Sequence, residues 1–364
     1  MIKTVGVCGY ISTGSSAFVD LLHEFDETQV LDIEVSFVRR EHGLEDLEYF
    51  LKKRGSFSAL TQFISFFTEY KFFGIQGREK IDKAALDKAL DDFLNKIVSN
   101  SQGHSYRNYI KNKKNTILKN IGKKVRKYLP AAIYRNATKR FRPNFEVMPE
   151  YFDAASRNFV FDVLKAFDIN CYNKDKNVLV LNQPFNARDP ITSFKYFENP
   201  MAIIVDRDPR DHYLFCKYFL HPRGLFVFPS DNVNDYIKWF RNKRFSPSGL
   251  RDRKDIIFIN FEELVYDSEN AIKKVTDFVG ITKHIRKGEC FKSSHSRNNT
   301  KLFLKYTECE SDIKKIEREL PEYIFPFENF PDIEPEGGMF YGSQTRKITK
   351  PIAEYIRDVK KGKY

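Results

Sequence analysis

The sequence predicts an α/β fold, in which a mostly parallel β-sheet is flanked by helices and carries a largely helical, basic insertion. Three observations support this prediction. Short apolar runs, typical of buried strands, alternate with amphipathic stretches of helical spacing. Hydrophobic residues make up 41% of the 364 residues, which is enough for a packed core. Positive charge is concentrated in one segment of the chain.

The expected elements follow one another in βα order. A first strand at 4–9 is followed by a helix at 15–25, whose apolar residues recur on one face. Further strands are expected at 29–35, 177–181, 201–205 and 256–261. Further helices are expected at 44–51 and at 268–279, the latter ending at Gly280. Strands that alternate with helices in this way indicate parallel pairing.

These elements divide the chain into three parts. Residues 1–55 and 151–310 are expected to form the α/β core, 56–150 the helical basic insertion, and 311–364 a helical or irregular C-terminal extension. The segment 93–145 contains 14 Lys or Arg residues and no Asp or Glu. Since the whole chain has a formal net charge of +12, the remaining residues together are slightly acidic.

The basic segment has its own helical pattern. Apolar residues recur at helical spacing before Pro130, at Ile110, Ile117, Leu118, Ile121, Val125, Tyr128 and Leu129. A basic amphipathic helix is therefore expected. Two interpretations stay open: a face that binds an anionic ligand or an anionic membrane surface, and a solvated helix packed on the core. No groove-reading motif accompanies the charge, so nucleic acid is not favoured as a partner.

Other features exclude several classes of protein. The five cysteines are scattered and never form a CxxC pair, so neither a disulfide framework nor a metal site is expected. The uncharged stretch 55–68 is shorter than the roughly 20 residues of a membrane span. A strand at 4–9 leaves no room for a signal peptide. We expect a cytoplasmic protein, with peripheral contact to the inner membrane surface through 93–145.

A phosphate-binding loop is expected between the first strand and the first helix. Residues 9–16 (GYISTGSS) have the spacing of GxxxxGK[ST], with Ser15 at the lysine position. Main-chain N–H groups at the start of a helix favour an anion. The missing ammonium group disfavours an ATPase, a GTPase or a P-loop kinase. The alternative is a small-residue turn with no ligand.

A second candidate anion site follows the strand at 201–205. Residues 207–211 (RDPRD) place Arg207 at the carboxyl end of that strand and Arg210 at the start of the next helix. An arginine at this edge of the sheet could bind a phosphate through paired N–H bonds. Alternatively, Arg207 and Arg210 pair with Asp208 and Asp211 as a structural cap.

Together these features resemble the sulfotransferases that use 3′-phosphoadenosine-5′-phosphosulfate (PAPS). Residues 13–16 (TGSS) match that family's loop for the 5′-phosphosulfate, and 207–211 match its 3′-phosphate signature. Residues 258–265 (FINFEELV) and 278–281 (FVGI) look like two further family segments in the same order. The stretches 14–22 and 43–47 look like a bacterial, carbohydrate-sulfotransferase-like branch.

The resemblance implies a P-loop-type parallel sheet and transfer of a sulfuryl group from PAPS to a hydroxyl or amine of a carbohydrate or glycolipid, with no metal. The insertion would lie on the acceptor or membrane-surface side. Binding of the donor would fall to the following residues: Ser12, Thr13, Gly14, Ser15 and Ser16 for the 5′ end, and Arg207, Arg210, Ser294 and Arg297 for the 3′-phosphate.

This sequence departs from the family pattern at three places. The family has Lys or Arg where this chain has Ser12, so the basic group at the leaving oxygen would come from Arg39, Arg40 or the basic segment. Phe215 replaces a serine of the 3′-phosphate site. Residues 292–299 (KSSHSRNN) keep positive charge but lack the family's glycines.

The resemblance also implies a catalytic base. Glu34, at the end of the second strand, fits the position of a Glu that sugar-modifying members use, although it also fits an exposed strand-end carboxylate. Glu41 and His42 are alternatives, so Glu34, Ser12 and His42 are the candidate catalytic residues. Asn182 and Gln183 are expected to hydrogen-bond the acceptor, and His212 to cap its helix.

Three other functions remain open at this stage. If the absence of a basic residue at position 12 abolishes turnover, the chain would be a non-catalytic nucleotide- or anion-binding protein of the same fold. A P-loop kinase is disfavoured by Ser15. An adaptor for membrane surfaces or nucleic acid would act through 93–145.

Overall fold

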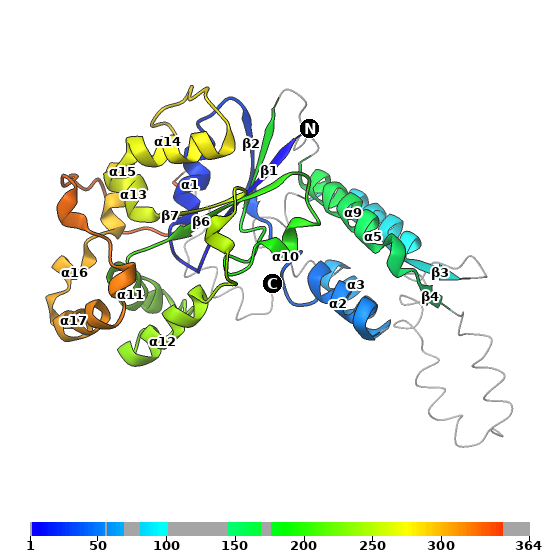
Figure 1. Cartoon of the computed structure of the whole chain (residues 1–364), viewed down its shortest axis with the longest axis horizontal. Helices are drawn as coiled ribbons and strands as arrows, with labels where there is room; N and C mark the ends of the chain where they lie inside the picture. The colour runs from blue at the N-terminus through cyan, green and yellow to red at the C-terminus, as the bar shows by residue number, and fades with distance from the viewer. Residues whose placement is uncertain (1, 55–56, 69–80, 101–144, 169–175, 345–364) are drawn as a thin grey trace, which may run out of the picture. The chain divides into compact units, whose positions relative to one another are not determined.

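The computed structural model describes residues 2–54, 57–68, 81–100, 145–168 and 176–344 (Figure 1). The chain divides into two compact units. The first comprises Met1–Val35, Cys171–Phe194 and Glu198–Tyr364, and the second comprises Ser36–Asn170 with Lys195–Phe197. The second unit thus takes in residues on either side of the expected insertion at 56–150.

A five-stranded parallel sheet forms the centre of the first unit. Its strands lie in the order β2-β5-β1-β6-β7, and every neighbouring pair is parallel. Their bounds are β1 Lys3–Gly9, β2 Thr28–Glu34, β5 Val178–Asn182, β6 Pro200–Asp206 and β7 Ile256–Asn260. The expected α/β fold with a parallel sheet is confirmed. Because all strands run the same way, their carboxyl ends lie at one edge of the sheet.

Helices flank the sheet and bury its apolar side chains. Alternate residues of three strands (Val5 and Val7, Val178 and Val180, Ile203 and Val205) belong to one core cluster. That cluster also holds side chains of α1 Ser15–Leu22, α13 Phe261–Tyr266 and α14 Ser268–Val279. A second cluster joins α11 Pro209–Phe215, α12 Val233–Arg244 and α17 Glu310–Glu319. Figure 1 shows these two groups of helices on opposite sides of β6 and β7.

Short elements complete the first unit. Helix α11 continues into a π-helical turn at Cys216–Leu220, and the remaining short α-helices are α10 Ile191–Phe194, α15 Ser293–Ser296 and α16 Leu302–Lys305. Helix α1 ends three residues earlier than expected. After Leu22 the backbone bonds tighten, because the Glu24 N–H donates to the Leu21 carbonyl, three residues back, at 3.0 Å, and the Thr28 hydroxyl donates to the Leu22 carbonyl.

The described part of the second unit is mainly helical. It contains α2 Leu44–Arg54, α3 Phe57–Thr68, α5 Lys83–Ile97, α9 Phe152–Phe167 and a short antiparallel pair of β3 Val98–Asn100 with β4 Phe145–Val147. Phenylalanine rings form its core, with Phe93 stacked on Phe159 at 4.8 Å between ring centroids and Phe63 packed beside both.

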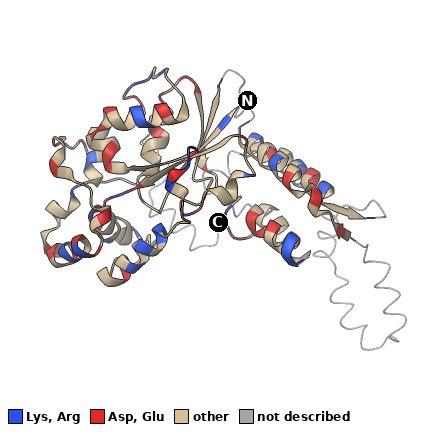
Figure 2. Ribbon diagram, viewed as in Figure 1, with Lys and Arg blue, Asp and Glu red and all other residues tan. Residues whose placement is uncertain are grey.

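Most of the basic segment, including its expected helix, lies outside the described residues. Basic and acidic positions alternate along the ribbons of the described helices (Figure 2). One example is the ion pair of Lys88 with Asp92, one turn apart on α5. No described helix is both long enough and apolar enough to cross a bilayer.

Gly6 in the central strand positions the chain that follows β5. A Cβ atom on Gly6 would lie 2.3 Å from the Phe185 ring and 2.6 Å from the Pro184 ring. The absence of a side chain therefore lets Pro184 and Phe185 pack directly against β1. Gln183, which precedes them, donates its N–H to the Val7 carbonyl at 2.8 Å.

We predict that Gly6→Ala destabilises the protein, because the new methyl group must displace a packed ring. The expected loss is about 1–3 kcal/mol, measured by chemical denaturation. Gly338→Ala is the control, since a Cβ at Gly338 meets nothing within 4 Å. Equal stability of the two variants would contradict this account of the strand.

Candidate functional site

The loop between β1 and α1 has an unusual backbone. Ile11 and Ser12 both have positive φ angles, 76° and 55°, and Gly14 has φ 88°. Gly14 is required for a second reason, because a Cβ there would lie 2.4 Å from the Phe261 ring. Two successive non-glycine residues in this region cost about 1–3 kcal/mol each. Contacts from outside the loop must therefore hold it.

Thr13 fixes the loop to the neighbouring strand. Its hydroxyl accepts from the Tyr10 N–H at 3.2 Å and donates to the Val205 carbonyl of β6 at 2.8 Å. The side chain is buried. The Thr13 hydroxyl, which the sequence placed in a phosphate cradle, thus holds the loop closed.

Gln183 holds the two ends of the loop. Its Oε1 accepts from the Gly9 N–H at 3.3 Å, and its Nε2 donates to the Ser15 hydroxyl at 2.8 Å. The sequence indicated acceptor binding for Gln183, and in the structure its amide is engaged with the loop. The neighbouring Asn182 is buried, and its Oδ1 has no hydrogen-bond partner among the described residues.

The loop ends at the start of α1 with main-chain donors. Ser15 and Ser16 are the first two residues of the helix, so their N–H groups have no acceptor within it. The preceding residue, Gly14, offers no side chain that could cap them. These amides and the positive end of the helix dipole suit a phosphate or sulfate group.

Arg207 lies against the loop. Its Nη1 donates to the Ser12 carbonyl at 3.0 Å, and its Nη2 donates to the Asn299 carbonyl. The guanidinium group also packs over the rings of Phe215 and Phe261, with 4.7 and 5.6 Å to their centroids. Arg207 therefore brings together the loop, the end of β6 and the segment 297–299.

The charge of Arg207 is buried, and no carboxylate of the described residues contacts its guanidinium. Only 3% of the residue is exposed. Burial lowers its pKa, and the more distant Asp211 and Glu262 oppose that shift. Its two hydrogen-bond partners are neutral carbonyls, and its Nε has no partner among the described residues. Its positive charge would favour an anion bound at the loop.

Arg210 has a different environment from Arg207. It forms a paired contact with Asp208, Nε to Oδ1 at 3.0 Å and Nη2 to Oδ2 at 2.8 Å, and its Nη1 contacts Glu317 at 2.9 Å. Although burial opposes it, the Asp208 carboxylate raises the pKa of Arg210. The structural-cap alternative therefore describes Arg210, whereas Asp211 accepts from the N–H groups of Lys301 and Leu302 at 2.7 Å each.

Two buried acids lie near Arg207. Burial, together with the charge of Asp208, raises the pKa of Asp211 to about 7. The same two causes raise the pKa of Glu262 well above its ordinary value. Glu262 accepts from the Asp208 N–H through Oε1 at 3.1 Å, while Oε2 has no partner among the described residues. Protonation of Glu262 removes the cost of this uncompensated oxygen.

Ser294 and Arg297 contact the C-terminal part of the described chain. The Ser294 hydroxyl donates to Glu336 at 2.8 Å. Arg297 contacts Asp332 at 3.1 Å through Nε and the Thr300 carbonyl at 2.9 Å through Nη1. Asn299 of the same segment reaches Arg207, so the segment lies beside the loop even though these two side chains turn elsewhere.

The candidate catalytic residues lie in different places. Glu34 is exposed at the carboxyl end of β2, opposite Asn182 in the register, and therefore at the same edge of the sheet as the loop. The Ser12 hydroxyl is buried without a partner among the described residues. His42 belongs to the second unit, where its N–H donates to Asp46 at 2.8 Å before α2.

His212 does not cap its helix as expected. It is fully buried, and its Nε2 lies 2.8 Å from the Ile11 carbonyl of the loop. Sequence inspection missed this contact, because nothing local to His212 indicates a partner 201 residues away.

A cavity of about 320 Å³ borders the loop at Tyr10. Its wall combines aromatic rings, hydroxyls and charged groups, contributed by Tyr10, Asp206, Arg244, Ser246, Ser248, Arg251, Asp252, Phe258 and Tyr323. Arg251 packs over Phe258 at 4.3 Å, and Arg244 is paired with Asp206. No group of three His, Cys, Asp or Glu residues in the described part of the chain is arranged to hold a metal ion.

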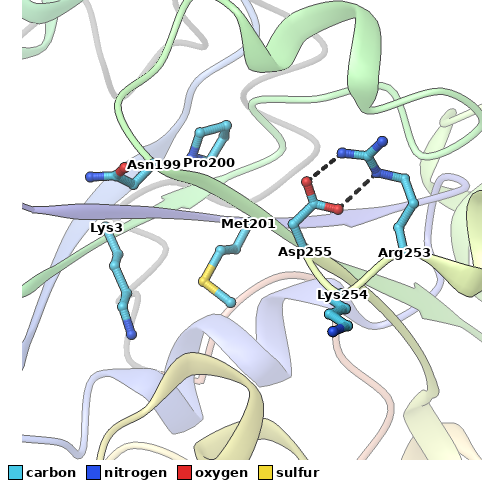
Figure 3. A pocket seen from close by; sticks show the side chains of 7 residues that line it. All are labelled: Lys3, Asn199, Pro200, Met201, Arg253, Lys254 and Asp255. Carbon is cyan, nitrogen blue, oxygen red and sulfur yellow. Dashed lines mark hydrogen bonds and ion pairs between the residues drawn. The ribbon is translucent and has the colours of Figure 1, made fainter.

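A second, more open groove of about 730 Å³ lies at the opposite edge of the sheet (Figure 3). Lys3, Pro200 and Asp255 mark the amino ends of β1, β6 and β7, and Arg253 is paired with Asp255 at 2.6 Å. This groove is separated from the loop by the length of the strands.

Comparisons with known proteins find weak structural similarity to sulfotransferases. No family model and no curated protein matches the sequence. The sulfotransferase domain of the olefin synthase of Synechococcus PCC 7002 is 12% identical, with 84% of this chain and 82% of that chain covered and a TM-score of 0.34. A sulfotransferase of Mycobacterium tuberculosis H37Rv is 11% identical, with 78% and 68% covered and a TM-score of 0.34.

A third solved structure is a retinol dehydratase in complex with androsterone and the inactive cofactor PAP. It is 12% identical, with 78% of this chain and 61% of that chain covered and a TM-score of 0.27. Similarity at this level does not assign an activity to this chain, whose function has to be inferred from its own site.

We predict that Glu262→Gln makes stability less dependent on pH. Because the folded-state pKa of Glu262 is raised, the unfolded chain loses this proton near pH 4.5 while the folded chain keeps it, so wild-type stability falls as pH rises. The melting temperature of the variant should therefore exceed that of the wild type increasingly from pH 5 to pH 8. Glu263→Gln is the control, and a pH-independent difference for Glu262→Gln would contradict the prediction.

Proposed function

We propose that the chain is a sulfotransferase, which moves a sulfuryl group from PAPS to a hydroxyl or amine of a carbohydrate or glycolipid. The observation that carries this proposal is the pair of Arg207 contacts, one to Ser12 and one to Asn299. Through them, three segments that resemble donor-binding motifs come together at the carboxyl edge of the parallel sheet. Crevices at this edge are the usual ligand sites of such folds.

The donor would bind with its two charged ends on different groups. Main-chain amides of Ser15 and Ser16 face the place expected for the 5′-phosphosulfate, as the first N–H groups of α1. The buried guanidinium of Arg207 has neutral partners only, and its charge supports an assignment to the 3′-phosphate. Because Arg210 is already paired with Asp208 and Glu317, we do not include it among the donor contacts.

The transfer itself requires positioning, charge stabilisation and a base. The acceptor oxygen attacks sulfur, the bond from sulfur to the bridging oxygen breaks, and adenosine 3′,5′-bisphosphate leaves with the negative charge. Donors aimed at that oxygen supply most of the catalysis in such displacements. Glu34, exposed at the same edge of the sheet, is proposed to take the acceptor proton.

The cavity beside Tyr10 supports a sugar as the acceptor. Tyr10, Phe258 and Tyr323 contribute aromatic rings to its wall, and Ser246 and Ser248 contribute hydroxyls. Arg244 and Arg251, which pack over these rings, add N–H donors suited to sugar hydroxyls. Its volume of about 320 Å³ admits one sugar unit. If the acceptor is a glycolipid, we propose that residues 93–145 contact the membrane surface that carries it.

One observation favours a second candidate function. Ser12 occupies the place of the family's basic residue, and within the described part of the first unit no lysine contacts the loop. A chain that binds the nucleotide without turnover would retain the Arg207 arrangement and lack transfer. Binding and transfer therefore have to be measured separately.

We predict that adenosine 3′,5′-bisphosphate stabilises the protein against heat more than ADP or AMP does at equal concentration. At a concentration one hundred times the dissociation constant, a ligand adds about 2.7 kcal/mol, which is a shift of several degrees. Incubation with labelled PAPS and a panel of glycans then tests transfer. Stabilisation without transfer would select the non-catalytic alternative, and equal shifts with ADP would reject the proposed donor.

We also predict that Arg207→Met weakens binding of adenosine 3′,5′-bisphosphate about tenfold or more beyond its effect on AMP, because only the former carries a 3′-phosphate. Calorimetric titration gives both affinities, and circular dichroism shows whether the variant folds. Arg253→Met, at the opposite edge of the sheet, is the matched control. Equal losses for the two nucleotides would remove Arg207 from the 3′-phosphate site.

A further inference from the structure

Two successive carbonyl groups of the loop are held by side chains from one segment. The Ile11 carbonyl faces Nε2 of His212 at 2.8 Å, and the Ser12 carbonyl accepts from Nη1 of Arg207 at 3.0 Å. Arg207 directly follows β6, and His212 is the fourth residue of α11. The positive φ angles of Ile11 and Ser12 coincide with these two contacts.

The surroundings of His212 fix its tautomer. Burial, followed by the charges of Arg244 and Arg207, lowers the pKa of His212 well below its ordinary value, so the ring is neutral. A carbonyl oxygen can only accept, and Nε2 must therefore carry the proton. Nδ1 is then an acceptor that lies 3.0 Å from the Tyr236 hydroxyl, whose proton also has the Pro209 carbonyl as an acceptor at 2.8 Å.

The ring of His212 is also fixed by packing. It stacks on Phe228 with 4.3 Å between centroids and an interplanar angle of 11°, and Trp239 lies parallel to it at 5.8 Å. Phe228 and Trp239 also stack on each other at 4.7 Å, so both rings pack on one side of the imidazole. This packing and the contact from Nε2 to the Ile11 carbonyl hold the N–H of His212 at one point beside the loop.

The consequence for the loop follows from peptide geometry. In a trans peptide the carbonyl and the N–H of the next residue point in opposite directions, and no described peptide is cis. Holding the Ile11 and Ser12 carbonyls toward His212 and Arg207 therefore turns the N–H groups of Ser12 and Thr13 the other way. Consecutive N–H groups that point to one side form an anion-binding nest.

We propose that His212 is a positioning residue for the phosphate loop, which aims the Ser12 N–H at the 5′ end of a bound nucleotide by holding the Ile11 carbonyl. This proposal deepens the sulfotransferase function and rests on it for the identity of the ligand. In place of the loop lysine of other phosphate-binding loops, this chain uses a neutral imidazole that acts through the backbone.

The test compares His212→Phe, which removes the donor, with His212→Gln, whose side-chain amide places an N–H close to the position of Nε2. We expect His212→Phe to weaken binding of adenosine 3′,5′-bisphosphate and of AMP about tenfold. Binding of adenosine 3′-monophosphate, which has no 5′-phosphate, should change less than threefold. His212→Gln should recover most of the lost affinity.

A matched control separates positioning from packing. Phe228→Leu removes a ring that stacks on His212 but leaves the contact from Nε2 to Ile11 in place. It should lower the melting temperature and leave the three affinities close to those of the wild type. Equal losses with all three nucleotides in His212→Phe, or losses as large in Phe228→Leu, would overturn the proposal.

A measurement on the free protein makes the test independent of the nucleotide. Amide hydrogen exchange in peptides covering residues 10–16 should become about tenfold faster in His212→Phe and stay unchanged in His212→Gln and Phe228→Leu. Failure of the wild type to bind any nucleotide would reject the proposed function. Unchanged exchange at 10–16 in His212→Phe would reject the positioning role whatever the ligand.

Discussion

The site depends on one buried positive charge. The Arg207 side chain is buried, with only 3% of the residue exposed, and its guanidinium donates hydrogen bonds to neutral carbonyls. A buried charge without a partner is costly, and here the cost is reduced at a distance by Asp211 and Glu262. No carboxylate of the described residues contacts the guanidinium, so its positive charge is not neutralised locally. An anion at the loop would therefore be attracted more strongly than by an arginine that is paired with a carboxylate.

The loop obtains its shape from its surroundings rather than from its own sequence. Of the loop's two glycines, Gly9 and Gly14, Gly14 has the positive φ angle, and there the Phe261 ring excludes a side chain. Ile11 and Ser12 adopt positive φ without that freedom, so the energy that holds them comes from His212, Arg207 and Thr13. A loop shaped in this way is pre-organised, since these donors and acceptors lie on buried parts of the sheet and α11. Because such main-chain donors are already ordered in the free protein, binding an anion costs little further conformational entropy.

The sequence predicted the strands well and the roles of polar residues poorly, for physical reasons. Buried strands appear as local apolar runs, and the end of α14 appears as Gly280, which has φ 77°, so both can be found within a few residues. The partner of a polar side chain is set by tertiary packing instead. Gln183 meets Ser15 across 168 residues and His212 meets Ile11 across 201, and no local pattern encodes either contact. Helix α1 was predicted too long because its apolar pattern continues to Phe25, while the Leu22 carbonyl accepts from the Thr28 hydroxyl instead of continuing the helix.

The two arginines of residues 207–211 have different partners and different roles. Asp208 caps α11 by accepting from the Arg210 N–H at 2.8 Å, and the same carboxylate then binds the Arg210 guanidinium. This pairing is local, so the turn that starts the helix already commits Arg210 to it. Arg207 precedes the turn at the end of β6, and among the described residues no carboxylate contacts its guanidinium. Its side chain extends to the loop and to Asn299. A strand end followed by Asp-Pro therefore commits one arginine to the helix and leaves the other at the edge of the sheet, where we propose that the donor binds.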